Sequence, residues 1–271
     1  MITKVQGEKG KIFGVLFACL AMVACAKQAP APEASVPAAP DPQPVAAQDE
    51  RQEPAHAVII VPPGTEAPAD LEGKLAGWKS SGLLSGSVLV KKFGFKVKDG
   101  YGEGFEQFAV LDFPDEAAFD KWKAGAAAEL GPNVIASRVD VLADRRSRNN
   151  DPAKSVYVVA QYESQLSNED YRYYTEDYVE PNMANQYASG IMTRYTMYIE
   201  REPSGGLERP KAILVTEYAS KADFERKAAV KDAYKAVLLS GTHPEWARLN
   251  SIKHSIRTSL AETFAKPVQV Q

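Results

Sequence analysis

Tyrosines between residues 167 and 182 are the first candidates for binding chemistry in this chain. Tyr171, Tyr174 and Tyr178 lie at i, i+3 and i+7, so a helix would present them on one face. Such a face offers a wall for a flat ligand, and its hydroxyls would orient that ligand. The same stripe also arises when tyrosines pack a helix against a sheet. Both interpretations remain open from the residues alone.

Three further residues could bring charge or proton transfer to the same region. His254 could act as a general base or a haem ligand, although no carboxylate partner can be identified for it. Arg257 lies three residues later and occupies a place similar to Arg138 in the preceding half, which favours a shared structural ion pair. Arg194 could bind an anionic group at a barrel mouth, or it could be a solvated strand residue.

Other catalytic patterns cannot be identified in the chain. It contains no recognisable Ser-His-Asp set, phosphate-binding glycine loop or paired carboxylates. Its three histidines, His56, His243 and His254, are scattered singly and match no metal-ligand spacing. We therefore expect no catalytic set, no metal site and no cofactor.

The two cysteines, Cys19 and Cys25, lie in the stretch ACLAMVACAKQ. A lysine-rich start precedes an uncharged run over residues 12–24, which is shorter than the roughly 20 residues of a membrane-spanning helix. This pattern is typical of a secretory signal peptide. The end of the run, MVAC, resembles the lipobox of bacterial lipoproteins, with Met22 where leucine is usual.

The lipobox resemblance implies that Cys25 carries diacylglycerol and an N-acyl chain after cleavage before it. Several acyl chains would give lasting attachment to a lipid bilayer, and Cys19 would leave with the signal peptide. Ala26, in the place where aspartate would signal inner-membrane retention, favours the outer membrane facing the periplasm. An uncleaved short anchor and a buried N-terminal helix are the alternatives.

Composition divides the rest of the chain. The net charge is −3 and the basic residues form no block beyond RRSR at 145–148, so nucleic acid is not an expected partner. Residues 26–55 hold seven prolines and no aromatic residue, which is typical of a disordered tether. We predict a signal peptide over 1–24, a tether over 25–55, a first unit over 56–144, a linker over 145–154, a second unit over 155–264 and a tail over 265–271.

The two units share one order of elements. We predict strands over 57–63, 85–95, 108–114 and 133–143 with helices over 67–82 and 115–130, then strands over 156–162, 189–199, 212–218 and 255–264 with helices over 167–182 and 220–238. The register also repeats, because Phe113 and Phe119 fall 105 residues before Tyr218 and Phe224. This near-constant offset indicates an internal duplication.

Local signals support these elements. Ser167-x-x-Asp170 and Ser220-x-x-Asp223 have the form of capping boxes at helix starts. On the helix over 220–238, the residues at i, i+3, i+4, i+7 and i+8 form an apolar face that we expect to contact a sheet. These residues are Val230, Ala233, Tyr234, Val237 and Leu238.

The order of elements predicts the α+β class, with two ferredoxin-like βαββαβ units. Several strands, such as AVIIV and AILV, are apolar on both faces, so both faces should be buried. Packing the two units sheet to sheet, as an intrachain pseudo-dimeric α+β barrel, would bury them.

The second unit resembles the dimeric α+β barrel superfamily, especially its small uncharacterised domains. The resemblance rests on VYVVAQYES, the tyrosine-rich first helix and RPKAILVTEYASKADFERKAAVKDAYKAV, and it covers about residues 155–264. Those domains often carry Arg-Gly-Gly at strand two, where this chain has Ser189-Gly190 and Arg194. The superfamily includes cofactor-free monooxygenases, isomerases, dye-decolourising haem proteins and domains without known activity.

Three functions follow as hypotheses. The leading one is an envelope lipoprotein whose barrel binds a small apolar ligand or an envelope protein without catalysis. The ligand-binding residues would be Tyr171, Tyr174, Tyr178, Arg194, His254 and Arg257. The alternative is a cofactor-free monooxygenase- or isomerase-type enzyme with Tyr174, Arg194 and His254 near one pocket, and a second alternative is a purely structural envelope protein. A pocket holding His254 beside a tyrosine hydroxyl or a carboxylate would favour the enzyme.

Overall fold

A computed structural model describes residues 54–93, 104–147 and 151–268. Cys25, the predicted signal peptide and all but the last two residues of the predicted tether lie outside the described residues. Within the described ranges, no helix is long and apolar enough to cross a membrane.

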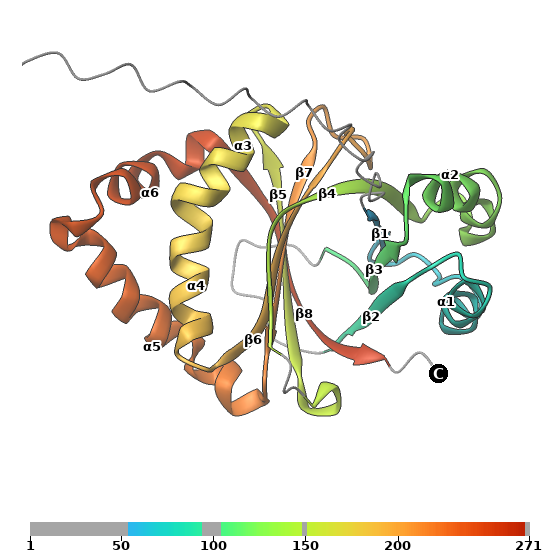
Figure 1. The fold of residues 1–271 in the computed structure, drawn as a ribbon, viewed down its shortest axis with the longest axis horizontal. Coiled ribbons are helices and arrows are strands. Elements are labelled where there is room, and N and C mark those ends of the chain that lie inside the picture. Colours follow the sequence, from blue (N-terminus) through green and yellow to red (C-terminus); the bar gives the residue numbers. More distant parts are fainter. Residues whose placement is uncertain (1–53, 94–103, 148–150, 269–271) are drawn as a thin grey trace, which may run out of the picture. The chain divides into compact units, whose positions relative to one another are not determined.

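Eight antiparallel strands of the described residues close into one barrel (Figure 1). Around the barrel they follow the order β1-β3-β2-β8-β5-β7-β6-β4. The strands are β1 (Ala55–Val61), β2 (Gly86–Lys92), β3 (Gln107–Phe113), β4 (Ile135–Arg146), β5 (Val156–Ser164), β6 (Met192–Glu200), β7 (Lys211–Tyr218) and β8 (Arg257–Val268). The predicted α+β class and the barrel are confirmed.

The two halves of the barrel are joined along both edges. Strand order is β4-β1-β3-β2 in the first half and β8-β5-β7-β6 in the second, so the halves match strand for strand. Ladders between β2 and β8 and between β4 and β6 connect them, with Lys91 opposite Lys266 and Asp144 opposite Thr196. One closed sheet therefore takes the place of the two stacked sheets that we expected.

The helices gather in two groups outside the barrel (Figure 1). They are α1 (Leu71–Ser80), α2 (Glu116–Ala124), α3 (Asn168–Tyr174), α4 (Glu180–Ala188), α5 (Lys221–Val237) and α6 (Pro244–Ile256). Two π-turns extend the second group, η3 (Thr175–Val179) between α3 and α4 and η4 (Leu238–Thr242) between α5 and α6. Both capping boxes are confirmed, because Ser167 and Ser220 accept hydrogen bonds from the backbone N–H of Asp170 and Asp223 at 3.1 and 3.2 Å.

Apolar side chains fill much of the barrel interior. Because side chains alternate along a strand, every second residue points inward. Val58, Val110 and Val215 belong to a buried inner cluster with Phe105, which comes from the segment before β3. This part of the interior is a packed core, as in small barrels generally.

The first helical group packs tightly on its strands. Trp78 of α1 meets Trp122 of α2 edge to face, with ring centroids 5.8 Å apart. Phe113 and Phe119 complete a buried aromatic cluster beneath these helices. The space between helices and sheet in this half is therefore filled by side chains.

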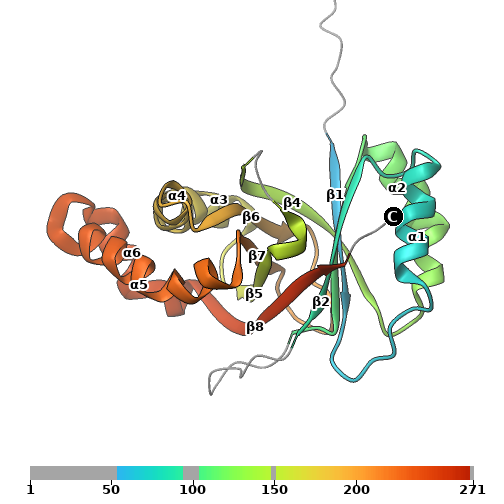
Figure 2. The ribbon, with the colours of Figure 1, turned by 90° about the horizontal axis from the view of Figure 1, so that it is seen from below.

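The second helical group is more open, and Figure 2 shows α5 and α6 extending away from the strands. In the 17-residue α5 only Phe224 is fully buried. The predicted apolar face covers the core only in part, since Leu238 is 1% exposed and Val230 packs against the core, whereas Val237 is 54% exposed. Lys227 also faces the strands, 3.2 Å from Glu262 of β8.

One packing contact recurs at the predicted offset of 105 residues. Phe113 and Phe119 meet edge to face in the first half, with ring centroids 5.4 Å apart. Tyr218 and Phe224 make the same contact in the second half, at 5.7 Å. In both halves the pair joins the end of a strand to the helix that follows, as the repeat in the sequence predicts.

Candidate functional site

A cavity of about 310 Å³ lies between the second helical group and strands β5 and β8. We name it the helical pocket. It is lined by Ala160, Tyr162, Tyr178, Asn182, Lys231, Lys235, Trp246, Asn250, Lys253, His254, Arg257, Ser259, Ala261 and Glu262. Its volume falls at the lower end of the range typical of small-molecule sites, and its lining is mostly polar.

Three of the six predicted site residues line this pocket, namely Tyr178, His254 and Arg257. Tyr171 and Tyr174 stand behind them, buried in the adjacent core. His254 lines the same cavity as Tyr178 and Glu262, but among the described residues the Tyr178 hydroxyl bonds Asn250 and Glu262 pairs with Lys227. The histidine is exposed and belongs to the last turn of α6, a helix that the sequence interpretation did not identify.

A continuous stack of aromatic rings forms one wall. Tyr171 contacts Tyr174 edge to face, Tyr174 stacks on Tyr178, and Tyr178 stacks on Trp246, with centroid separations of 5.2, 5.0 and 5.2 Å. The Trp246 indole donates to the Tyr178 carbonyl oxygen at 2.9 Å, and the Tyr178 hydroxyl bonds the Asn250 side chain at 3.1 Å. Tyr178 lies inside the π-turn η3, a type of distortion that occurs often at functional sites.

Arg257 lies at the centre of this wall. Its guanidinium carbon is 3.9 Å from the ring centroid of Tyr162 and 5.6 and 5.8 Å from those of Tyr174 and Tyr178. Three aromatic faces can stabilise the cation in this geometry. Burial acts to lower the pKa of Arg257, but the neighbouring tyrosine oxygens raise it on balance, so the side chain stays charged.

Unsatisfied polar atoms cluster around the same guanidinium. In the described part of the chain, eight buried side-chain polar atoms have no hydrogen-bond partner, and Arg257 Nη1, the Tyr171 hydroxyl and the Tyr174 hydroxyl are among them. Burial raises the pKa of Tyr171 to about 12, against the opposing charge of Arg257. All three groups can donate a hydrogen bond, and the Tyr171 hydroxyl, which can also accept one, interacts with the Arg257 guanidinium.

The structural ion pair expected for both Arg138 and Arg257 exists only for Arg138, which bonds Glu116 and the His56 carbonyl oxygen. Arg257 makes no ion pair with any described carboxylate, because aromatic rings surround it. The two arginines occupy similar places in the two halves but have different surroundings. The prediction of a shared role is therefore wrong for Arg257.

Positive charge dominates the rest of the lining. Burial lowers the pKa of Lys231 and of Lys253, and repulsion from Lys235 and Arg257 contributes to both shifts. Lys231 is only partly buried, with more than a third of its surface exposed. The lining carboxylate, Glu262, pairs with Lys227 outside the pocket. The helical pocket thus holds four neighbouring cations and one carboxylate that is already paired.

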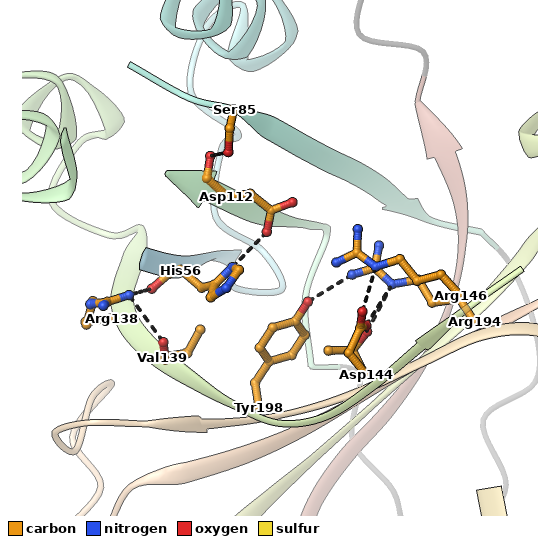
Figure 3. Close-up of polar contacts among 10 residues, drawn as sticks. His56, Ser85, Asp112, Arg138, Val139, Asp144, Arg146, Arg194 and Tyr198 are labelled. Atoms are coloured by element: carbon orange, nitrogen blue, oxygen red, sulfur yellow. Dashed lines mark hydrogen bonds and ion pairs between the residues drawn. The ribbon is translucent and has the colours of Figure 1, made fainter. Parts of the chain in front are cut away.

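Arg194 does not belong to this pocket. Strand alternation places Tyr195, Met197 and Ile199 under the helices, so Arg194 points to the barrel interior on the other face of the sheet. There it donates to Thr196 at 3.0 Å and to the Tyr198 hydroxyl at 3.1 Å (Figure 3). The prediction that Arg194 shares a pocket with Tyr174 and His254 is wrong.

The barrel mouth contains a histidine-carboxylate pair that sequence reasoning missed. His56 Nδ1 lies 2.8 Å from an Asp112 carboxylate oxygen (Figure 3). Burial acts to raise the pKa of Asp112, but the His56 hydrogen bond and the charges of Arg146 and Arg194 lower it overall. An imidazole held by a partly buried carboxylate is the arrangement of an oriented general base. The two residues lie opposite each other on neighbouring strands, so the pair could be predicted only if the register of β1 and β3 were known.

His56 also borders a second, larger cavity of about 880 Å³, which we name the groove. The groove is lined by Pro54, His56, Asp115, Glu116, Ala117, Arg138, Val139, Asp140, Val141, Arg172 and Arg201. Its charges are largely matched, since Arg138 pairs with Glu116 and Arg201 lies 2.9 Å from Asp140. The groove therefore lacks the excess of unpaired cations that distinguishes the helical pocket.

Comparisons with known proteins find similarity among solved structures. No family model matches the chain, and no curated protein matches it. Among solved structures, an anthrone oxidase-like protein is 11% identical with a TM-score of 0.49, covering 81% of this chain and 93% of its own. A monooxygenase-like protein from Fusobacterium nucleatum is 12% identical with a TM-score of 0.48, and the match covers 80% of this chain and 94% of that protein. A dye-decolorizing peroxidase from Bacteroides thetaiotaomicron is 9% identical with a TM-score of 0.42, and the match covers 82% of this chain and 96% of that protein. These proteins are dimeric α+β barrels.

The leading functional prediction requires correction. The solved structures that resemble the barrel are described as enzymes, which contradicts the hypothesis of a binding protein without catalysis. The charged lining of the helical pocket also argues against an apolar ligand. Identities near 10% assign no particular reaction to this chain, so the reaction has to be argued from its own residues.

Haem does not fit the helical pocket. A flat macrocycle needs an apolar slot with an axial ligand directed into it. His254 is exposed at the rim, and the Arg257 guanidinium, stacked on Tyr162, occupies the inner wall. We derive no step through haem.

Proposed function

We propose that this protein is an enzyme of the cofactor-free isomerase or monooxygenase type, with its active site in the helical pocket. Its first step would remove a proton from a carbon next to a carbonyl group, or from the hydroxyl group of a phenol. In the carbonyl compound the C–H electron pair would form the C=C bond as the C=O π pair moves onto oxygen, which gives an enolate, and the phenol would give a phenolate. Return of the proton at another atom completes an isomerisation, and reaction of the same anion with dioxygen begins an oxygenation.

The observation that carries the proposal is the buried Nη1 of Arg257, which makes no hydrogen bond with a described residue, although the Tyr171 hydroxyl interacts with the same guanidinium. Leaving a buried donor unsatisfied costs about 1–3 kcal/mol. An enolate oxygen would supply the missing acceptor and a charge opposite to the guanidinium. Preorganised donors of this kind stabilise a developing oxyanion, often by the largest single contribution to catalysis.

His254 is the proposed general base. A histidine can accept and return a proton near neutral pH, and this one shares the cavity with Arg257. Tyr178 would contribute an aromatic face, while Tyr171 and Tyr174 would position Arg257 from behind. Arg194 has no role in this site.

The difference between the two halves of the barrel supports the choice of site. Beneath α1 and α2, the rings of Trp78, Trp122 and Phe119 fill the space between helices and sheet. The corresponding space beneath α5 and α6 contains the helical pocket. One half would thus serve as scaffold while the other half retains a site.

A hydrogen-exchange screen tests the proposal. The purified barrel is incubated in D₂O with a panel of enolisable aromatic carbonyl compounds and phenols, phenylpyruvate first, and mass spectrometry follows deuterium uptake at carbon. We expect exchange above the buffer rate for at least one compound, and a loss of about 100-fold or more in His254→Asn. Arg226→Met, on the outer surface of α5, serves as the control. If no compound exchanges faster than in buffer, the proposal fails.

The groove provides a second candidate site, because His56 is oriented by Asp112. A base in that position would serve the same proton transfer on a larger substrate. The variant His56→Asn distinguishes the two candidate sites, because it removes this base and leaves the helical pocket intact. Loss of exchange in His56→Asn with retention in His254→Asn would move the active site to the groove.

Two further elements of the proposal concern the whole chain. We propose that Cys25 carries the lipid anchor and that the barrel works on the periplasmic side of the outer membrane. We also propose that the two halves are duplicated ferredoxin-like units. The matching strand order and the aromatic contact repeated at an offset of 105 residues support the duplication.

A further inference from the structure

The face of α5 toward the sheet carries lysines beside the buried apolar residues Phe224 and Leu238, where a helix normally carries apolar residues alone. Lys227, Lys231 and Lys235 lie at i, i+4 and i+8, so they share one face, and we name them the lysine row. Lys227 contacts strand β8 through Glu262 and the ring of Phe264. This contact fixes the row toward the sheet, and Lys231 and Lys235 line the helical pocket.

Such a row is unfavourable without compensation. Like charges at i and i+4 destabilise a helix, and Glu262 compensates only Lys227 within ion-pair distance. Lys231 and Lys235 form no ion pair with any described residue. Lys253, from α6, adds a third cation to the same rim, where its amine donates to the Asn250 side-chain oxygen at 3.1 Å and forms no ion pair with a described carboxylate.

The charges are near one another as well as unpaired. All three lysines line one cavity of about 310 Å³; burial lowers the pKa of Lys231 and Lys253, repulsion from Lys235 adds to both shifts, and Glu262 opposes that of Lys231. This concentration of positive charge occurs in a chain whose net charge is −3. Arg257 lies deeper, against the aromatic wall, so the positive charge reaches from the inner wall to the rim.

From this arrangement we propose that the substrate is an aromatic carboxylate whose carboxylate binds the three rim lysines, Lys231, Lys235 and Lys253. The inference rests on the proposed function for the reacting group, an enolisable oxygen placed at Arg257. The ring would lie along Tyr178 and Trp246, whose own rings are stacked 5.2 Å apart. A carboxylate at the rim and an enolate within would match the two regions of positive charge.

Binding is measured apart from turnover with two unreactive probes of the same shape, 3-phenylpropanoate and 3-phenylpropanamide. Isothermal titration calorimetry on the folded protein should give a dissociation constant for the carboxylate at least about tenfold below that for the amide. Raising sodium chloride from about 0.05 to 0.5 M should weaken the carboxylate alone, because salt screens exposed charges.

A matched pair of variants assigns the effect to the rim. Lys231→Gln combined with Lys235→Gln removes two inward charges, and the preference for the carboxylate should disappear. Lys221→Gln combined with Arg226→Gln removes two outward charges from the same helix, where both residues are exposed and paired locally, and the preference should remain. Circular dichroism confirms that both double variants fold.

Equal affinity for the two probes, equal losses in the two double variants, or no saturable binding of the carboxylate would each overturn the inference. Carboxylate binding without any hydrogen exchange would sustain it while refuting the proposed function. Exchange of neutral and anionic compounds at equal rates would support the proposed function while refuting the inference that the substrate is a carboxylate.

Discussion

Replacement of Arg257 by methionine tests whether this arginine serves to bind a ligand or to stabilise the fold. The free energy of unfolding should change little, because two effects oppose each other. Arg257→Met removes a cation held by three tyrosine rings, which contributes about 1–2 kcal/mol. It also removes a buried donor without an acceptor, which relieves about 1–3 kcal/mol. Methionine is flexible enough to fill the space left between the rings.

We therefore expect Arg257→Met to alter the free energy of unfolding by no more than about 1 kcal/mol in either direction. The matched control is Arg138→Met in the first half. Arg138 also has an unpartnered buried atom, Nε, but it donates to the His56 carbonyl oxygen at 2.7 Å, pairs with Glu116 and stacks on Phe119 at 4.9 Å, so its loss should destabilise the barrel by about 1–3 kcal/mol.

Urea unfolding followed by tryptophan fluorescence and circular dichroism measures both variants. The reasoning about Arg257 would be refuted by a loss of about 3 kcal/mol or more in Arg257→Met, because a structural ion with satisfied contacts would then be indicated.

Three further predictions concern pH, helix capping and the anchor. Burial raises the pKa of both Tyr171 and Tyr218 to about 12, so the unfolded chain loses these protons first; stability should be intact below pH 10 and fall as pH rises through 12, and a flat unfolding profile over this range would contradict the assignment. Ser220→Ala removes the cap of α5 and should cost about 1 kcal/mol, measured by urea unfolding, and a loss below about 0.3 kcal/mol would count against the cap. Palmitate labelling should disappear in Cys25→Ser, and labelling that persists would exclude Cys25 as the anchor.

Some of the site could be predicted from the sequence because it depends on local spacing. Tyr171, Tyr174 and Tyr178 do share one buried face, and His254 and Arg257 adjoin it. The position of Arg194 was predicted wrongly, although the alternation of side chains along the strand places it on the opposite face from Tyr195 and Met197. Apolar residues on the helix side require Arg194 to face the barrel.

The face of α5 could be predicted only in part. Leu238 and Val230 pack on the core as the apolar series predicts, but Lys227, Lys231 and Lys235 adjoin them on the helix, where hydropathy disfavours contact with the sheet. The anion site that we propose would account for these cations, because a bound anion would compensate them. Conflicts between local pattern and observed packing are expected at functional sites.

Long-range pairs could not be predicted at all. His56 and Asp112 are 56 residues apart, and they meet only because β1 and β3 pair in a particular register. The start of α6 was also missed, although Pro244 at its first position is a typical helix-start signal. The π-turn η4 before it breaks the periodicity on which helix prediction depends.

The most direct test of the central claim compares three proteins on the compound that exchanges fastest in the hydrogen-exchange screen. The wild type, Arg257→Met and His56→Asn are incubated with it in D₂O, and deuterium uptake at the acidic carbon is followed by mass spectrometry. We predict that Arg257→Met loses about 100-fold or more of the enzymatic rate, while His56→Asn keeps it. Full exchange in Arg257→Met, or its loss in His56→Asn alone, would contradict an active site in the helical pocket.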